Sequence, residues 1–254
     1  GIARTRAAYR DITELREVEA LFLEQIARAK RFVYAENQYF ASRSIAEAIA
    51  HRLSEPDPPE FVLIMPESSE GWLEQTAMDG ARVRLLHALA ERDHARRFRV
   101  FVPKTSGGQA IYVHAKLMIV DDEIVRVGSA NMNNRSMGLD SEADVFIDAA
   151  RPGNSHVPPI IGRLRRRLLA EHCGLSQETM DALLAGHGTM AEAIAAAKSP
   201  GKYLEPFSLR PLTDTEKALV DSALLDPETP GEFFEPIGRR RGLFRRGGYL
   251  RRPS

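Results

Sequence analysis

Short apolar runs and stretches of helical periodicity alternate along residues 1–104, and this alternation limits the possible folds more than any other feature. The apolar runs predict strands and the periodic stretches predict helices. In chain order we expect helix 14–30, strand 31–40, helix 42–53, strand 60–66, helix 72–94 and strand 98–103. Such alternation is typical of α/β domains. The predicted fold is therefore α/β, a mixed β-sheet flanked by helices on both faces.

The pattern changes after residue 110. Three strand-like runs follow one another at 111–120, 124–129 and 143–148, and helices are expected again at 157–173, 176–185 and 189–198. We expect one α/β unit over residues 1–208 and a C-terminal extension over residues 209–254.

The extension is expected to be helical and irregular and to end in an arginine-rich tail. Residues 238–254 hold seven arginines and no acidic residue, with Leu243, Phe244, Tyr249 and Leu250 between them. This composition fits a disordered, solvated tail. It equally fits an anchor for an anionic membrane surface, where each nearby cation contributes about 1 kcal/mol. A nucleic-acid contact is a third interpretation.

Composition excludes several classes of protein. The 35 basic and 35 acidic residues cancel, which does not indicate a globally basic nucleic-acid binder. The single cysteine, Cys173, rules out an internal disulfide and a cysteine-rich metal site. No run approaches the roughly 18 apolar residues of a membrane span. The sequence begins without Met, so we expect a piece of a longer protein, cytoplasmic or peripheral to a membrane.

The segment "VHAKLMIVDDEIVRVGSANMNNRS" (113–136) carries the candidate chemistry. Side chains alternate along a strand, so His114 and Lys116 should share a face. A two-residue loop at Asp122 and Glu123 would pair Lys116 with Ser129, and His114 with Asn131, and so bring all four side chains together. Asp121 has the opposite parity and is expected to organise the fold behind the site.

This set of side chains suits phosphodiester chemistry. A neutral imidazole can attack phosphorus or transfer a proton. Lys116, Ser129 and Asn131 can bind phosphoryl oxygens whose charge changes in the transition state. No carboxylate cluster accompanies them, so neither a divalent metal nor another cofactor is expected.

The spacing resembles the HKD motif of the phospholipase D superfamily at every signature position, His114-x-Lys116-x4-Asp121-x6-Gly128-Ser129-x-Asn131. "YAENQYF" (34–40), "EGWLEQTAMDGARVRLLHAL" (70–89) and "RLLAEHCGLS" (167–176) also resemble bacterial two-motif members, in their C-terminal half. The resemblance implies that Glu142 holds the imidazole of His114 by its other nitrogen. It also implies phospholipid hydrolysis and transphosphatidylation through a phosphohistidine.

Family members place two such motifs around one site, whereas this sequence has one. The resemblance therefore implies a second half-domain as partner, supplied by a missing N-terminal half or by a homodimer. In two-motif enzymes the first motif usually supplies the nucleophile, so His114 is expected to act as general acid and then as base. The fragment alone is expected to be weakly active or inactive.

Two alternatives to a phospholipase D stay open. The same residues could serve a dimeric single-motif endonuclease, or the chain could be a catalytically silent module that binds lipid or a partner. Asn37 and Gln38 could border the site, because polar residues often lie at strand ends, or could belong to a turn that satisfies its own backbone. Arg135 and Ser136 follow the motif directly and are further candidates for contact with it.

Overall fold

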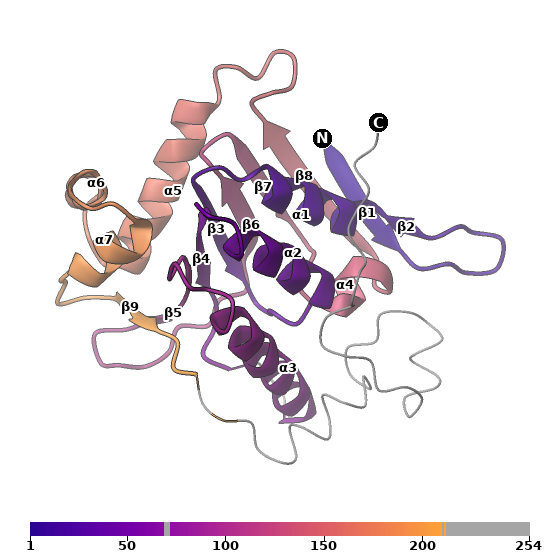
Figure 1. The fold of residues 1–254 in the computed structure, drawn as a ribbon, viewed down its shortest axis with the longest axis horizontal. Helices are drawn as coiled ribbons and strands as arrows, with labels where there is room; N and C mark the ends of the chain where they lie inside the picture. The colour runs from indigo at the N-terminus through magenta and orange to yellow at the C-terminus, as the bar shows by residue number, and fades with distance from the viewer. Residues whose placement is uncertain (69–71, 210, 212–254) are drawn as a thin grey trace.

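The computed structural model describes residues 1–68, 72–209 and 211, without the side chains of residues 72–77. Within these residues nine strands form one sheet in the order β2-β1-β8-β7-β6-β3-β4-β5-β9 (Figure 1). The strands are β1 (Ile2–Arg6), β2 (Leu15–Arg16), β3 (Phe32–Asn37), β4 (Glu60–Ile64), β5 (Phe98–Lys104), β6 (Lys116–Val120), β7 (Ile124–Gly128), β8 (Glu142–Asp148) and β9 (Tyr203–Pro206).

The sheet is mixed, as expected. Strands β3, β4 and β5 are parallel to one another, and the other pairings are antiparallel. Every residue of β3 and β4 is buried, which matches their nearly continuous apolar sequences. These two strands form the centre of the sheet, and the site strands β6, β7 and β8 continue from it.

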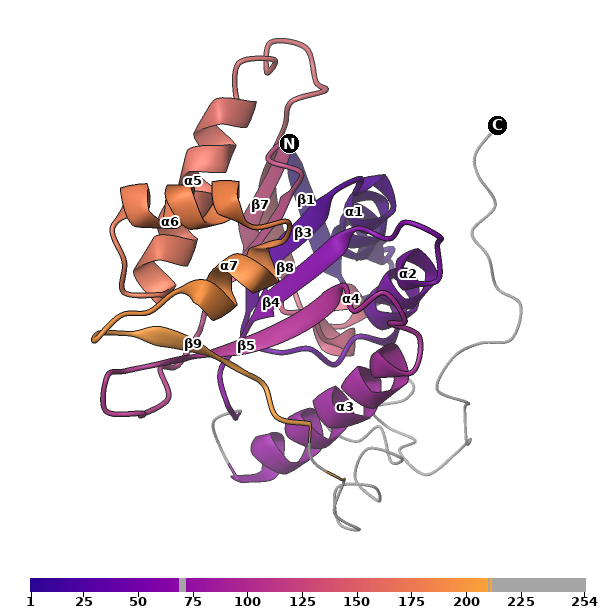
Figure 2. The same cartoon turned by 60° about the vertical axis from the view of Figure 1, so that its left-hand side comes forward.

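Helices cover both faces of the sheet (Figures 1 and 2). They are α1 (Glu17–Arg28), α2 (Arg43–Leu53), α3 (Trp72–Ala90), α4 (Asn134–Gly138), α5 (Pro158–His172), α6 (Gln177–Gly186) and α7 (Met190–Ala196). Apolar residues of α1, α2 and α3 pack on one face of β3, β4 and β6. Residues of α5, α6 and α7 pack on the opposite face. The prediction of an α/β fold with helices on both faces is confirmed.

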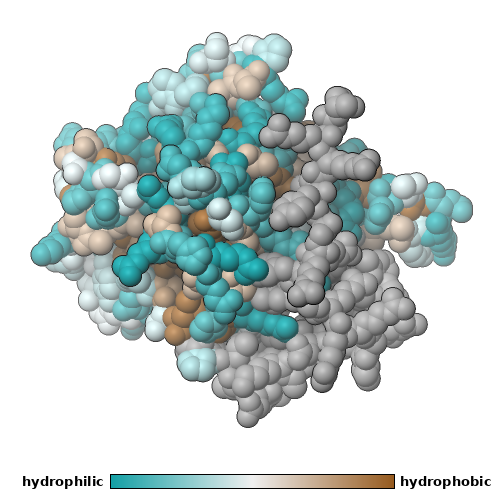
Figure 3. Space-filling view, viewed as in Figure 1, coloured by the Kyte–Doolittle hydropathy of each residue, from teal (hydrophilic) through white to brown (hydrophobic). Residues whose placement is uncertain are grey.

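The helix layer seen in Figure 1 presents a largely hydrophilic surface with small apolar patches (Figure 3). No described helix is both long enough and apolar enough to cross a membrane. The arginine-rich tail at 238–254 and the rest of residues 212–254 lie outside the described residues, so their predicted behaviour stays a prediction.

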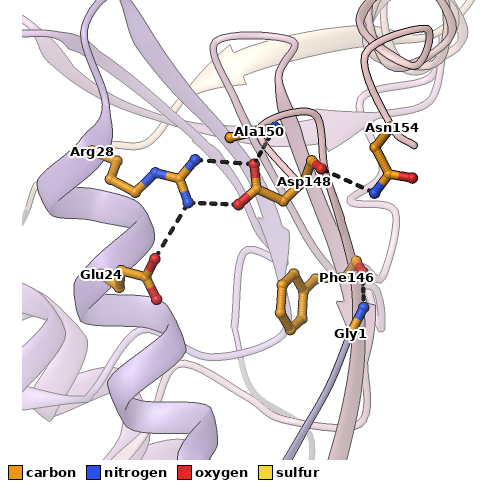
Figure 4. A network of polar contacts seen from close by, with 7 residues as sticks. All are labelled: Gly1, Glu24, Arg28, Phe146, Asp148, Ala150 and Asn154. Atoms are coloured by element: carbon orange, nitrogen blue, oxygen red, sulfur yellow. Dashed lines mark hydrogen bonds and ion pairs between the residues drawn. The ribbon is translucent and has the colours of Figure 1, made fainter. Parts of the chain in front are cut away.

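An ion pair fastens the end of β8 to the end of α1 (Figure 4). Both terminal nitrogens of Arg28 donate to the carboxylate of Asp148, at 2.6 and 3.0 Å. The backbone N–H of Ala150 donates to the same carboxylate at 3.0 Å. The Arg28 guanidinium holds the pKa of Asp148 below its usual range. The contact joins residues 120 positions apart and fixes how α1 lies across the sheet.

Four elements were not predicted. Strands β1 and β9 and the short helix α4 lie in segments without a clear period, and β2 lies within a predicted helix. Residues 15–16, expected as helix, instead form β2. The expected strand 111–120 begins only at Lys116, so His114 lies in an irregular segment before β6.

Candidate functional site

The candidate site lies where four strand ends meet. Strand β6 is antiparallel to both β3 and β7, and β7 is antiparallel to β8. The end of β3 is therefore next to the start of β6, and the end of β7 is next to the start of β8. This arrangement gathers Gln38, Lys116, Ser129 and Glu142 at one edge of the molecule, with His114 just before β6.

Lys116 is the buried cation of the site, with 8% of its surface exposed. Its ammonium donates to Oε1 of Gln38 at 2.9 Å and to the backbone oxygen of His114 at 3.0 Å. Burial lowers the pKa of Lys116, and the negative charge of Glu142 acts in the opposite direction. Gln38, expected only at the border, thus contacts the central cation directly.

His114 is exposed, and its ring stacks on Tyr112 with centroids 6.5 Å apart and an interplanar angle of 21°. The structure does not contain the predicted hydrogen bond between His114 and Glu142. The Glu142 carboxylate accepts instead from Ser136 Oγ at 2.6 Å and from Ser129 Oγ. Each of its two oxygens accepts from a serine.

The predicted hairpin register is wrong by one residue. Val120 pairs with Ile124 and Leu117 with Val127, so residues 121–123 form the turn. Asp121 and Asp122 adopt left-handed conformations, with φ of 55° and 60°, and a three-residue turn results. Strand β7 ends at Gly128, so Ser129 and Asn131 follow the strand instead of facing Lys116 and His114 across the hairpin.

Asp121 organises the fold behind the site, as its parity suggested. Its carboxylate accepts hydrogen bonds from the backbone N–H groups of Lys30, Arg31 and Phe32 at 2.7–2.8 Å. These groups precede and begin β3. The motif aspartate therefore ties the β6–β7 turn to the start of the strand that carries Asn37 at its other end.

The loop after Ser129 is held by the "ENQYF" segment. Asn37 Oδ1 accepts from the N–H of Met132 at 3.0 Å. The Met132 carbonyl accepts from the N–H groups of Ala41 and Ser42 at 2.7 and 2.9 Å. Asn37 is thus a support of the loop, and the neighbouring Asn131 keeps a buried Oδ1 without a partner.

Helix α4 supplies a further support. The N–H of Asn131 donates to Ser136 Oγ at 3.1 Å, and the same hydroxyl donates to Glu142. Arg135 points its guanidinium to Asp140, at 2.7 and 3.1 Å. Of the two residues that follow the motif, Ser136 therefore contacts the site residues, and Arg135 pairs with a neighbour on its own turn.

Two buried charges under the site were not anticipated. Arg126 and Asp144 form an ion pair with both side chains fully buried, and the N–H of Ala130 donates to Asp144 at 3.2 Å. The pair supports the turn that carries Ser129. The signal was present in the sequence, because an arginine within the apolar run "IVRVG" requires a buried partner.

Tyr112 was also missed. Its hydroxyl accepts from Gln38 Nε2 at 2.7 Å, so it is linked through one amide to Lys116. No group of three or more histidine, cysteine or acidic side chains in the described part of the chain is placed to hold a metal ion.

Comparison with known proteins places these features in a family. The phospholipase D family model matches residues 88–204. Phospholipase D alpha 1 of Arabidopsis thaliana is 26% identical over 231 aligned positions, which cover 65% of this chain and 28% of the plant protein. Phospholipase D A of Dictyostelium discoideum is 25% identical over 207 positions, covering 63% of this chain and 16% of that protein. The chain thus spans less than a third of the length of either relative.

Two solved structures give weaker matches. The phospholipase D family member Nuc from Salmonella typhimurium aligns with a TM-score of 0.44 and 15% identity, over 66% of this chain and 89% of Nuc. Phosphatidylserine synthase of Haemophilus influenzae Rd KW20 aligns with a TM-score of 0.48 and 14% identity, over 68% of this chain and 38% of the synthase.

The mixed sheet and the His114–Lys116–Asp121 arrangement define an α/β protein with one HKD motif. Its motif residues and its matches to the family model and to curated phospholipases D support membership of the phospholipase D superfamily.

Proposed function

We propose that this chain contributes a half-site for phosphodiester cleavage of phospholipids by a phospholipase D mechanism. The observation that carries the proposal is the Lys116 ammonium beside the exposed His114. It donates two hydrogen bonds, and its third N–H meets no acceptor within the described residues. A free N–H on a partly desolvated cation that contacts the backbone of an exposed histidine suits a phosphoryl oxygen.

The proposed reaction divides the chemistry between two histidines. One imidazole attacks phosphorus and forms a phosphohistidine, while the other donates a proton to the departing alcohol oxygen. His114 takes the second role in this proposal and later removes a proton from the incoming water or alcohol. Water releases phosphatidic acid, and an alcohol gives a new phosphatidyl ester. Lys116 stabilises the charge on the phosphoryl oxygens in both steps.

The proposal requires a partner, because one HKD motif supplies one histidine. The partner is a second HKD half-domain, either part of the same longer protein or a second copy of this chain. The exposure of His114 fits this requirement, since a facing half-site needs access to the imidazole.

Lipid is favoured over nucleic acid as the substrate by the relatives' names. The plant, Dictyostelium and Phytophthora proteins matched are each named phospholipase D. The equal numbers of acidic and basic residues add support, because nucleic-acid binding depends strongly on cationic contacts to phosphates. The arginine-rich tail would add contacts to an anionic membrane surface.

Turnover of labelled phosphatidylcholine in dilute ethanol tests the proposal. At protein concentrations that allow two copies to pair, or with an N-terminal HKD half-domain added, we expect phosphatidic acid and phosphatidylethanol, both lost in His114→Ala and retained in His156→Ala, an exposed histidine outside the site. Supercoiled DNA is incubated in parallel. Cleavage of DNA alone would assign the site to a nuclease. Lipid binding that His114→Ala leaves intact, without any product, would favour a silent module.

A further inference from the structure

The hydrogen-bond network around Lys116 determines which way a neighbouring amide points. An ammonium group can only donate, so Gln38 must present its Oε1 to Lys116, at 2.9 Å. The Nε2 of Gln38 is therefore on the other side, where it donates to Tyr112 Oη at 2.7 Å and to Tyr39 Oη at 3.2 Å. Both N–H groups of the Gln38 amide therefore have an acceptor.

The orientation of Gln38 leaves the hydrogen of Tyr112 without an acceptor. Because Tyr112 Oη accepts from Gln38, its own O–H is available to a different group. No acceptor for it is present in the part of the chain that the structure describes. Tyr112 is 37% exposed, and its ring stacks on the imidazole of His114.

We propose that Tyr112 donates a hydrogen bond to a phosphoryl oxygen of a phosphodiester bound against His114 and Lys116. The inference rests on the proposed phosphodiester chemistry and deepens it by adding a substrate-binding residue. The unused N–H of Lys116 and the unused O–H of Tyr112 are linked through the single amide of Gln38, so their separation is fixed. Two donors at a fixed separation can hold two oxygens of one anion.

The chemistry of the phosphoryl group suits this assignment. A phosphodiester carries its negative charge on two non-bridging oxygens, and hydrogen bonds to charged acceptors are stronger than neutral ones. The tyrosine hydroxyl transfers no proton in this proposal: it accepts from Gln38 and donates to the phosphoryl oxygen. It would orient the phosphorus so that the imidazole approaches along a fixed direction.

A purely positioning role for Tyr112 predicts a different result. In that case Tyr112 would act only by holding Gln38, and Tyr39 holds the same Nε2. Tyr39→Phe and Tyr112→Phe would then have equal effects, because each removes one acceptor of Gln38. A direct contact predicts a larger effect for Tyr112→Phe. Tyr9→Phe, at a 62% exposed residue between β1 and β2, is the control outside the site.

Calorimetric titration of the whole chain with inorganic phosphate measures the contact without requiring turnover. We expect Tyr112→Phe to weaken phosphate binding by about 10- to 100-fold, the range for a lost hydrogen bond to a charged group. Tyr39→Phe should weaken it less, and Tyr9→Phe should match the wild type. Equal losses for Tyr39→Phe and Tyr112→Phe would overturn the inference, as would a wild type that binds no phosphate.

Competition against bound phosphate identifies the source of the phosphoryl group. Displacement by short-chain phosphatidylcholine would assign it to a lipid, and displacement by a dinucleotide would assign it to a nucleic acid. Displacement by neither would overturn the assignment to a phosphodiester. Tyr112-dependent binding without ester cleavage would support the inference and contradict the proposed function, so the two failures can be told apart.

Discussion

A side chain would not fit at position 128, because the carboxylate of Asp144 fills the space beside Gly128. A Cβ at position 128 would lie 1.9 Å from Asp144 Oδ1 and 2.6 Å from the Asp144 Cα. The neighbouring backbone cannot move without breaking the β7–β8 pairing. The same carboxylate pairs with Arg126 and accepts the N–H of Ala130. The glycine of the motif therefore permits the buried charge that supports the turn at Ser129.

Gly128→Ala should destabilise the protein and displace Ser129. We expect the free energy of unfolding to fall by about 1–3 kcal/mol, the usual cost of overpacking. Urea denaturation followed by circular dichroism measures the change. Gly186→Ala is the matched control, because nothing lies within 4 Å of a Cβ at that position. Equal stabilities of the two variants would contradict the steric explanation.

At the scale of secondary-structure elements, the site depends on contacts between segments far apart in the sequence. Asp121 fixes the β6–β7 turn to the start of β3, 89–91 positions away. Asn37, at the other end of β3, fixes Met132 in the loop after β7. Strand β3 is thus held to the hairpin at both ends. The Arg28–Asp148 pair adds a third link, from α1 to β8.

Asp148→Asn should reduce stability in a pH-dependent way. Arg28 lowers the pKa of Asp148 in the folded state, so the ionised form favours folding. Its contribution is present above the unfolded value of about 3.9 and is lost as pH falls through the lower folded value. We expect a loss of about 1–3 kcal/mol at pH 7, typical of a hydrogen-bonded charge.

Urea denaturation of wild type and Asp148→Asn at pH 7, 5 and 3 checks this prediction. The difference between the two proteins should shrink at pH 3. Glu24→Gln is the control, because Glu24 meets the same Arg28 at 3.3 Å but keeps 60% of its side chain exposed. A difference that stays constant with pH would show that the charge of Asp148 does not stabilise the fold.

The central elements could be predicted from the sequence, and the edges could not. Strands β3 and β4 are buried along their whole length and largely apolar, so their runs were plain. Strand β1, "IARTR", is exposed at alternate positions and pairs with residues of β8 that are distant in the sequence. The hairpin register was missed because two consecutive aspartates adopt left-handed conformations. Local patterns carry no information on such choices.

The site shows the same division. Motif spacing identified His114, Lys116 and Glu142 but could not show that the Glu142 carboxylate is occupied by two serines. Tyr112 could not be found from spacing, because its link to the site passes through Gln38, 74 positions away.

At the scale of the whole molecule, one sheet with two helical layers presents its candidate site at an edge. The residues come from strand ends and the following loops, with helices α1 to α3 on one side of the sheet and α5 to α7 on the other. The reacting groups are therefore accessible to a second body, which the proposed two-histidine chemistry requires.

Specific activity should fall towards zero as the protein is diluted. The proposed chemistry needs two histidines in each complete site, so if two copies supply them, copies that separate lose turnover. Addition of excess His114→Ala chain to the wild type should lower the activity further by forming mixed pairs. Initial rates over a dilution series, from micromolar to nanomolar, measure both effects. A specific activity independent of concentration would show that one chain is sufficient.

The pairing of β1 with β8 has a consequence for how the protein is made. Ile2 pairs with Val145, whereas β6, β7 and β8 follow one another within residues 116–148. A ribosome adds about 5–20 residues per second, so β8 is made on the order of ten seconds after β1. In limited proteolysis of ribosome-arrested chains, β1 should become resistant to cleavage only once β8 has emerged from the ribosome. The nascent polypeptide would thus carry the edge of β1 that faces β8 unpaired until β8 has been made, with only the short β2 on its other edge, and chaperones would have access to it in that period.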